Sequence, residues 1–230
     1  MEAEGRANPN QLVIAEHTLA GLERLRDVLI EAHRDRFGST SEPIAGLQLT
    51  HSGRFARPGK DGGLQPRIAF RHPLLDARVG VTDDSAILDD SEIEALIESF
   101  IAGAVHAREL GFDFVDIKHC HGYLLHEFLG AHTRPGPYGG SLENRTRILR
   151  EIVSGIRREA PGLHVAVRVS VFDSIPFRQG GEGEEGVPEH YPEGEPYHLG
   201  FGVDMANPVE QDLSEAVSYT HLTLPTTPYV

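Results

Sequence analysis

The sequence predicts an α/β protein, part of a (β/α)8 TIM barrel in which parallel strands are covered by outer helices. Three apolar segments, near residues 45, 113 and 165, have the length of buried strands. Helical patterns of about 15–20 residues separate them, and such crossovers return the chain to the same end of a sheet, so the strands must pair in parallel. The turn after the first strand lacks the Gly-x-Gly-x-x-Gly pattern of a Rossmann domain, which favours the barrel.

The first helix is expected from Thr18 to about Phe37, with Thr18 as its cap. Its apolar residues fall three or four positions apart, as in a helix: Leu19, Leu22, Leu25, Val28 and Leu29. A polar break at 38–43 ends the helix, and 44–50 is typical of a short buried strand. Residues 51–90 are rich in Gly, Pro and Asp, so we expect a long functional loop there.

The second helix is expected to begin at Asp89 or Ser91 and to end at a glycine cap, Gly111. A strand over 112–117 follows at once. Ser141 then has the position of a cap for a third helix, and the next strand covers 164–170. The alternation of helix and strand is the basis of the barrel prediction.

Composition limits the classes of function. A chain of 230 residues buries one sizeable core, and its net charge of −14 disfavours nucleic acid as a partner. No long apolar stretch or secretory signal is visible, so no membrane association is expected. The single cysteine, Cys120, fits a reducing cytoplasmic compartment. We therefore expect a cytoplasmic protein without a nucleic-acid or membrane partner, with a homo-oligomer left open.

Titratable side chains gather where the strand at 112–117 ends. Lys118, His119, His121 and Tyr123 follow it closely, and α/β enzymes place their chemistry at the carboxyl ends of parallel strands. Lysine is otherwise scarce, since Lys60 is the only other one in the sequence. His119 and His121 lack further ligands at a usual spacing, so we expect no metal site.

Four motifs stand out in the sequence: His-Gly-Tyr-Leu at 121–124, Tyr-Gly-Gly-Ser-Leu-Glu-Asn-Arg at 138–145, Gln-Leu-Thr-His-Ser-Gly-Arg at 48–54 and Val-Arg-Val-Ser at 167–170. Together they resemble motifs of the Old Yellow Enzyme family, the FMN-dependent NADH:flavin oxidoreductases. The resemblance covers roughly residues 5–215 and corresponds to the middle of that fold, so both ends of the barrel are expected to be missing.

The resemblance implies an ene-reductase that uses FMN, with NAD(P)H as reductant. It implies that Lys118 and His121 hold the carbonyl oxygen of an activated alkene and that Tyr123 donates a proton to carbon. Gln48 and Arg168 would bind the pyrimidine edge of the flavin. Lys118 departs from the family, where this position is most often histidine, although an ammonium also stabilises a developing negative charge.

Two other functional hypotheses stay open. Lys118 at a strand end also fits a barrel lyase that forms a Schiff base, and the chain is also consistent with a non-catalytic, truncated fragment. We expect residues 1–217 to form an incomplete flavin-binding barrel domain. Residues 218–230 contain no formally charged side chain, look like a read-through tail, and are expected to lie outside the fold. Without the strands that supply a phosphate site, the chain is expected to bind FMN weakly.

Overall fold

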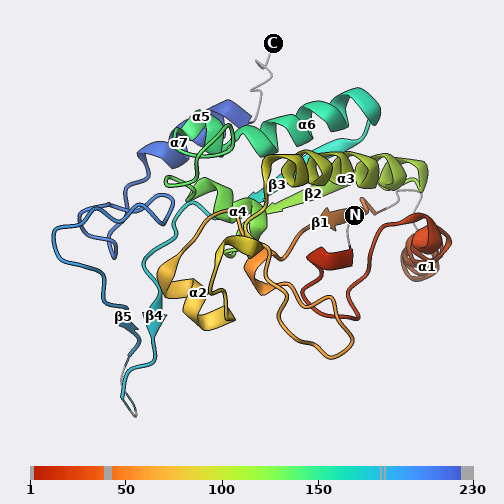
Figure 1. Ribbon diagram of the computed structural model, residues 1–230. Coiled ribbons are helices and arrows are strands. Elements are labelled where there is room, and N and C mark those ends of the chain that lie inside the picture. Colours follow the sequence, from red (N-terminus) through yellow and green to blue (C-terminus); the bar gives the residue numbers. More distant parts are fainter. Residues whose placement is uncertain (1–2, 39–42, 182, 184, 224–230) are drawn as a thin grey trace.

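A parallel sheet of three strands, in the order β1-β2-β3, is the centre of the fold (Figure 1). The computed structural model describes residues 3–38, 43–181, 183 and 185–223. The three strands are β1 (Gly46–Leu49), β2 (Phe114–His119) and β3 (His164–Val169). Both pairings are parallel, so the carboxyl ends of all three strands meet at one edge of the sheet.

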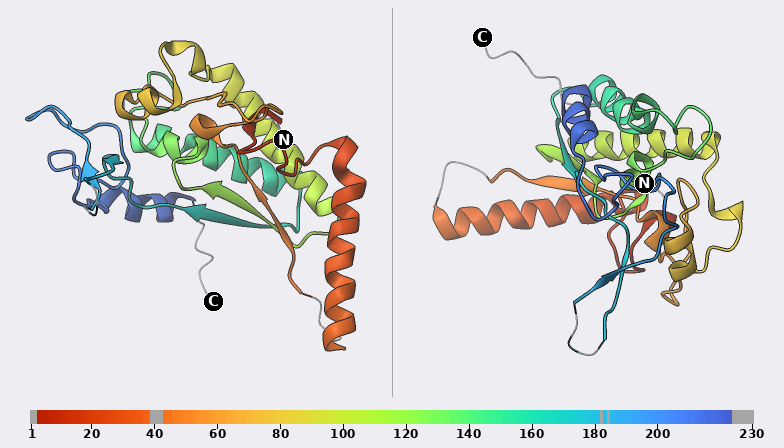
Figure 2. Two further views of the ribbon diagram at one scale, coloured as in Figure 1. Left: turned by 90° about the horizontal axis from the view of Figure 1, so that it is seen from below. Right: turned by 90° about the vertical axis from the view of Figure 1, so that its left-hand side faces the viewer.

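Two long helices, α3 (Asp90–Glu109) and α6 (Arg147–Glu159), lie side by side on one face of the sheet (Figures 1 and 2). The amino end of α3 is fixed by a capping box: Asp89 Oδ1 accepts a hydrogen bond from Glu92 N, and Glu92 Oε2 accepts one from Asp89 N, both at 2.8 Å. Apolar side chains along one face of α3 are buried, including Ile93 and Phe100, and the helix occupies the segment expected between Asp89 and Gly111.

Side chains of β2 alternate strictly between the two faces of the sheet. Val115, Ile117 and His119 are buried under the helices, whereas Asp116 and Lys118 lie on the opposite face and are half-buried. The strand begins and ends two residues later than we expected. Lys118 is therefore a strand residue with a defined face and does not belong to the loop that follows.

The first helix, α1 (Leu19–Phe37), lies at the β1 end of the sheet, next to the carboxyl end of α3 (Figure 2). Leu22 and Ile30 are buried, but three of the residues whose spacing predicted the helix, Leu25, Val28 and Leu29, are 45%, 52% and 55% exposed. In the described chain only one side of α1 packs against the core. Gly38 ends the helix in the left-handed conformation (φ 56°).

The remaining helices are short. The segment expected to be a loop, 51–90, contains α2 (Pro73–Val79). After β2 come α4 (Leu124–Leu129) and α5 (Leu142–Arg145), and Ser141 caps α5 instead of the longer α6 that follows it. The single-turn 3-10 helices are η1 (Ala3–Gly5), η2 (Glu16–Thr18), η3 (Gly53–Phe55) and η4 (Asp84–Ala86).

After β3, the chain forms a hairpin of β4 (Phe177–Arg178) and β5 (Val187–Pro188), which projects away from the sheet (Figure 1). The last described element is α7 (Ser214–Thr223), which crosses the expected domain boundary at residue 217. Within it Tyr219 is buried, and its hydroxyl is hydrogen-bonded to His119 Nδ1 at 2.7 Å. The other expected tail residues, 224–230, lie outside the described residues, and the origin of 218–230 stays a prediction from composition.

Candidate active site at the strand ends

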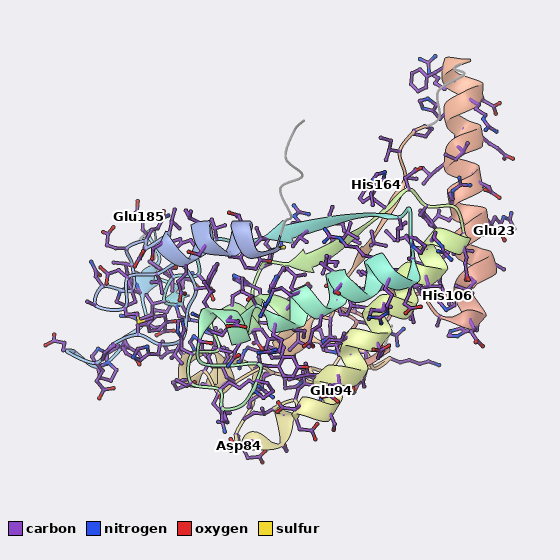
Figure 3. The ribbon with its side chains drawn as sticks, turned by 90° about the horizontal axis from the view of Figure 1, so that it is seen from above. Glu23, Asp84, Glu94, His106, His164 and Glu185 are labelled. Carbon is purple, nitrogen blue, oxygen red and sulfur yellow. The ribbon has the colours of Figure 1, made fainter. Side chains whose placement is uncertain are left out.

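Three of the predicted site residues, Gln48, Lys118 and Arg168, lie on the same face of the sheet. The register pairs Gln48 with Asp116 and Lys118 with Arg168, and residues paired across parallel strands point to the same side. The face is the one that α3 and α6 leave uncovered. The strand β3 begins at His164, which Figure 3 shows at the end of β3 farthest from α7.

Asp116 belongs to this face, and we did not anticipate it from the sequence. Gln48 Nε2 donates a hydrogen bond to Asp116 Oδ2 at 2.6 Å, which fixes the orientation of the Gln48 amide. The sequence did contain a signal for this placement. Side chains two positions apart along a strand point to the same face, and Asp116 stands two positions before Lys118. The Gln48 carbonyl oxygen stays available as an acceptor, since the amide nitrogen serves Asp116.

Lys118 and Tyr123 are in direct contact. The Lys118 ammonium lies 3.6 Å from the centroid of the Tyr123 ring, a cation–π arrangement. Phe55 lies on the same side, with its ring centroid 6.5 Å from that of Tyr123. Burial lowers the pKa of Lys118, the electrostatic interaction with Cys120 opposes this shift, and the Arg168 guanidinium adds to it. The Tyr123 ring therefore stabilises the positive charge of the Lys118 ammonium only in part.

His121 stands at the turn between β2 and α4 in a left-handed conformation, φ 62°. It is the only non-glycine residue with positive φ in the described chain, a conformation that costs about 1–3 kcal/mol unless its surroundings impose it. Two contacts hold the turn: His121 N donates to Ser170 Oγ at 3.2 Å, and Gly122 N donates to His126 Nδ1 at 2.9 Å. The His121 side chain is exposed beside the end of β3.

A buried ion network fixes the loop after β1 to α4. Arg54 is fully buried, and its Nε donates to Glu127 Oε1 at 2.6 Å while a second nitrogen pairs with Asp76 of α2. Glu127 Oε2 also accepts from Ala69 N at 3.0 Å. Burial raises the pKa of Glu127 to about 7 against the opposing effect of Arg54. The network gives the strand ends a rigid frame.

Cys120 and the neighbouring histidines show no arrangement for nucleophilic or metal chemistry. Cys120 is buried, and burial raises the pKa of its thiol, which disfavours the thiolate. His119 points under the helices, to the face opposite Lys118. Among the described residues, no group of three or more His, Cys, Asp or Glu side chains is placed to hold a metal ion.

None of the helices that the structure describes has both the length and the apolar character needed to span a bilayer.

The sequence matches the family model of the NADH:flavin oxidoreductase / NADH oxidase family over residues 30–186. The NADPH dehydrogenase of Halalkalibacterium halodurans is 34% identical over 181 residues, covering 77% of this chain and 47% of that protein. The NADH:flavin oxidoreductase of Gibberella zeae is 33% identical over 187 residues, covering 75% of this chain and 43% of that protein. The chain therefore spans slightly under half the length of these curated relatives.

The fold is similar to that of morphinone reductase in complex with tetrahydroNAD, with a TM-score of 0.57, 26% identity, and coverage of 75% of this chain and 49% of that one. Structural neighbours of this kind are TIM barrels, so the expected fold class is confirmed: the three parallel strands and their helices are part of a (β/α)8 barrel. The uncovered face of the sheet, with Gln48, Lys118 and Arg168, corresponds to the inside of such a barrel.

Proposed function

The chain belongs to the NADH:flavin oxidoreductase / NADH oxidase family, and we propose that it acts as an FMN-dependent oxidoreductase of the ene-reductase type. Its acceptor would be a small molecule with an activated C=C bond. The observation that carries the proposal is the grouping of Gln48, Lys118 and Arg168 on one face at the strand ends, with Tyr123 packed on Lys118. NAD(P)H is the proposed reductant.

The donor set on this face fits the pyrimidine edge of a flavin, which carries two carbonyls and an imide N–H. The Gln48 amide offers a carbonyl oxygen while its nitrogen is held by Asp116. The Arg168 guanidinium is exposed on the same face, and no carboxylate among the described residues pairs with it. A guanidinium beside that edge stabilises negative charge. Gln48 and Arg168 are therefore the proposed flavin-binding residues.

When bound, the flavin supplies the hydride chemistry, and the side chains of the chain bind and protonate the acceptor. Lys118 and His121 are proposed to donate hydrogen bonds to the carbonyl oxygen of the acceptor, which draws electron density from the alkene. The Tyr123 hydroxyl is proposed to give its proton to the alkene carbon. The hydrogen bonds from His121 N to Ser170 and from Gly122 N to His126 keep this turn in place.

The test is reduction of a simple enone, 2-cyclohexenone, by NADPH in the presence of FMN, measured both in this chain and in a full-length protein that carries it. Saturated ketone should form in the full-length protein, and the rate should fall when Arg168 is replaced by methionine. The proposal is wrong if the full-length protein binds no flavin and consumes no NADPH.

A Schiff-base lyase is the second candidate, because burial lowers the pKa of Lys118 and a neutral amine is the nucleophile that such enzymes need. The pairing of Gln48 with Asp116 and the exposed Arg168 on the same face favour the flavin instead. Borohydride reduction with a carbonyl compound, followed by mass spectrometry, distinguishes the two. A stable adduct on Lys118, absent from Lys60, would support the lyase.

A further inference from the structure

We propose that the segment between β5 and α7, residues 189–212, contains an acid-sensitive latch. Two histidines outside this segment, His72 and His132, hold the latch closed while they are neutral and release it when they take up protons. The segment, here called the strap, is the blue coil between β5 and α7 in Figure 1. The strap does not include the proposed flavin and acceptor residues, so the latch does not depend on the proposed function.

Both histidines bind the same turn of the strap. His72 Nε2 lies 3.1 Å from the Tyr197 hydroxyl, and Tyr197 is buried. His132 Nε2 donates a hydrogen bond to Gly200 O at 3.2 Å, three residues further along the chain. His72 caps α2 and His132 follows α4, so the two contacts attach the turn to two separate parts of the chain. This turn, residues 197–200, is the proposed latch.

The geometry around His72 requires its neutral form. Its Nδ1 accepts a hydrogen bond from Leu75 N at 3.3 Å, so the ring proton lies on Nε2, which donates to the Tyr197 hydroxyl. A second proton on Nδ1 would face the Leu75 N–H and break this contact. His72 is also 3% exposed, and charge on so buried a ring is costly. Protonation therefore favours a state in which the latch is open and the ring is hydrated.

The surroundings of both histidines disfavour a positive charge. Burial lowers the pKa of His72 and that of His132 to about 4, and nearby arginines add to both shifts. Two carboxylates oppose the shifts without outweighing burial. The charged or titratable groups that face the two rings are Arg54, Asp76 and Arg78 at His72, and Arg145, Glu215 and His198 at His132. When the latch opens, both histidines regain an ordinary pKa of about 6.5.

Protons therefore favour the open latch between about pH 6.5 and pH 4, because in this range the histidines bind them in the open state and not in the closed one. Asp173 opposes this effect. Its N donates to Phe201 O at 2.9 Å, next to the latch, and burial raises the pKa of its carboxyl to about 6, so it takes up a proton while the latch is closed. From pH 6 to 5, two histidines against one carboxyl should raise the ratio of open to closed latch about tenfold.

Amide hydrogen exchange of the unmodified chain measures this opening even when the open state is rare. The reporting amides are those of Tyr197, which donates to Met205 O at 2.8 Å, and of Asp173. After correction for the intrinsic pH dependence of exchange, both should open about tenfold more often at pH 5 than at pH 6. The amides of α3 report global unfolding and should stay better protected at both pH values. Exchange at Tyr197 as slow as in α3 would mean that the turn opens only when the whole chain unfolds, and would refute the latch.

Glutamine variants assign the effect, because the glutamine amide keeps an N–H near the position of Nε2 but does not titrate. His72→Gln or His132→Gln alone should make the opening nearly independent of pH. In the double variant only Asp173 still titrates, so the ratio of open to closed latch should fall about fivefold from pH 6 to 5. His198→Gln, at an exposed histidine, is the control and should keep the rise of about tenfold.

Thermal melts check that each variant folds, and if the double variant does not, the two single variants decide in the same way. The latch is refuted if opening in the unmodified chain does not increase from pH 6 to 5, or if the increase survives in the glutamine variants. No flavin or acceptor is present in these measurements. Failure to bind flavin refutes the proposed function, whereas exchange that is indifferent to pH refutes the latch alone.

Discussion

The Lys118 ammonium lies over the face of the Tyr123 ring, 3.6 Å from its centroid. The contact uses the ring and leaves the hydroxyl free for other chemistry. Substitution of tyrosine by phenylalanine therefore removes the hydroxyl and keeps the packing on Lys118. This makes Tyr123→Phe a specific probe of proton donation.

In a full-length protein that carries this segment, Tyr123→Phe should slow alkene reduction by about 10²–10⁴-fold, the usual loss when a general acid is removed. Reduction of the flavin by NAD(P)H should stay nearly unchanged, because that half-reaction needs no proton on carbon. Stopped-flow absorbance separates the two half-reactions. Equal losses in both would remove Tyr123 from the proposed role.

Arg54→Met should destabilise the fold by about 3–5 kcal/mol, because it leaves the buried carboxylates of Glu127 and Asp76 without their shared cation. Arg57→Met is the matched control, since Arg57 is exposed, and it should change stability by less than about 0.5 kcal/mol. Urea unfolding measures both. A small effect of Arg54→Met would show that the network does not hold the strand-end loops.

Stability should fall as the pH is lowered from 7 to 5. Burial lowers the pKa of His72 and of His126 to about 4, so both stay neutral in the folded chain but take up protons when it unfolds below about pH 6.5. The unfolded state then binds more protons, at a cost of up to about 1.4 kcal/mol per pH unit for each histidine.

Two buried acids act in the opposite direction. Burial raises the pKa of Glu127 to about 7 and that of Asp173 to about 6, so both favour the folded state as the pH falls. His119 and His132, with pKa values lowered to about 3 and about 4, add to the effect of the other histidines and outweigh the acids. Urea midpoints at pH 7 and 5 check the sign. A higher midpoint at pH 5 would contradict the neutral state of these histidines.

Close packing of α3 against α6 depends on Gly155. A Cβ atom there would clash with Cδ1 of Ile101 and lie 2.7 Å from its Cγ1, so Gly155→Ala should cost about 1–3 kcal/mol. Gly21 of α1 is the control, because nothing lies within 4 Å of its added Cβ. Gly21→Ala should stabilise by about 0.5–1 kcal/mol through helix propensity. Thermal melts measure both, and stabilisation by Gly155→Ala would refute the close contact.

Much of the fold follows from local patterns. A helix opening at Asp89 or Ser91 and ending at a Gly111 cap was predicted and corresponds to α3, and parallel pairing followed from the helices between the strands. The exact bounds of β2 did not follow, because Lys118 and His119 are polar residues that end a strand. His119 is buried under the helices and Lys118 is half-buried on the other face, and both placements depend on tertiary packing that the local sequence does not reveal.

The candidate site was predictable in part. The motifs pointed to Gln48, Lys118 and Arg168, and the structure places all three on one face. Asp116 was missed because its role depends on the register with Gln48, which no single strand reveals. The Arg54 network was missed for the same reason, since its partners lie in α2 and α4, far apart in the sequence.

The most direct test of the central claim is a flavin titration of the unmodified chain, Arg168→Met and the control Arg157→Met, whose arginine is exposed on α6. FMN and lumiflavin, a flavin without the ribityl phosphate, are compared by fluorescence quenching. Because Gln48 and Arg168 are proposed to bind only the isoalloxazine edge, both flavins should bind weakly and equally. Affinity should fall about tenfold or more in Arg168→Met and stay unchanged in Arg157→Met. Flavin binding that is indifferent to Arg168 would contradict the account.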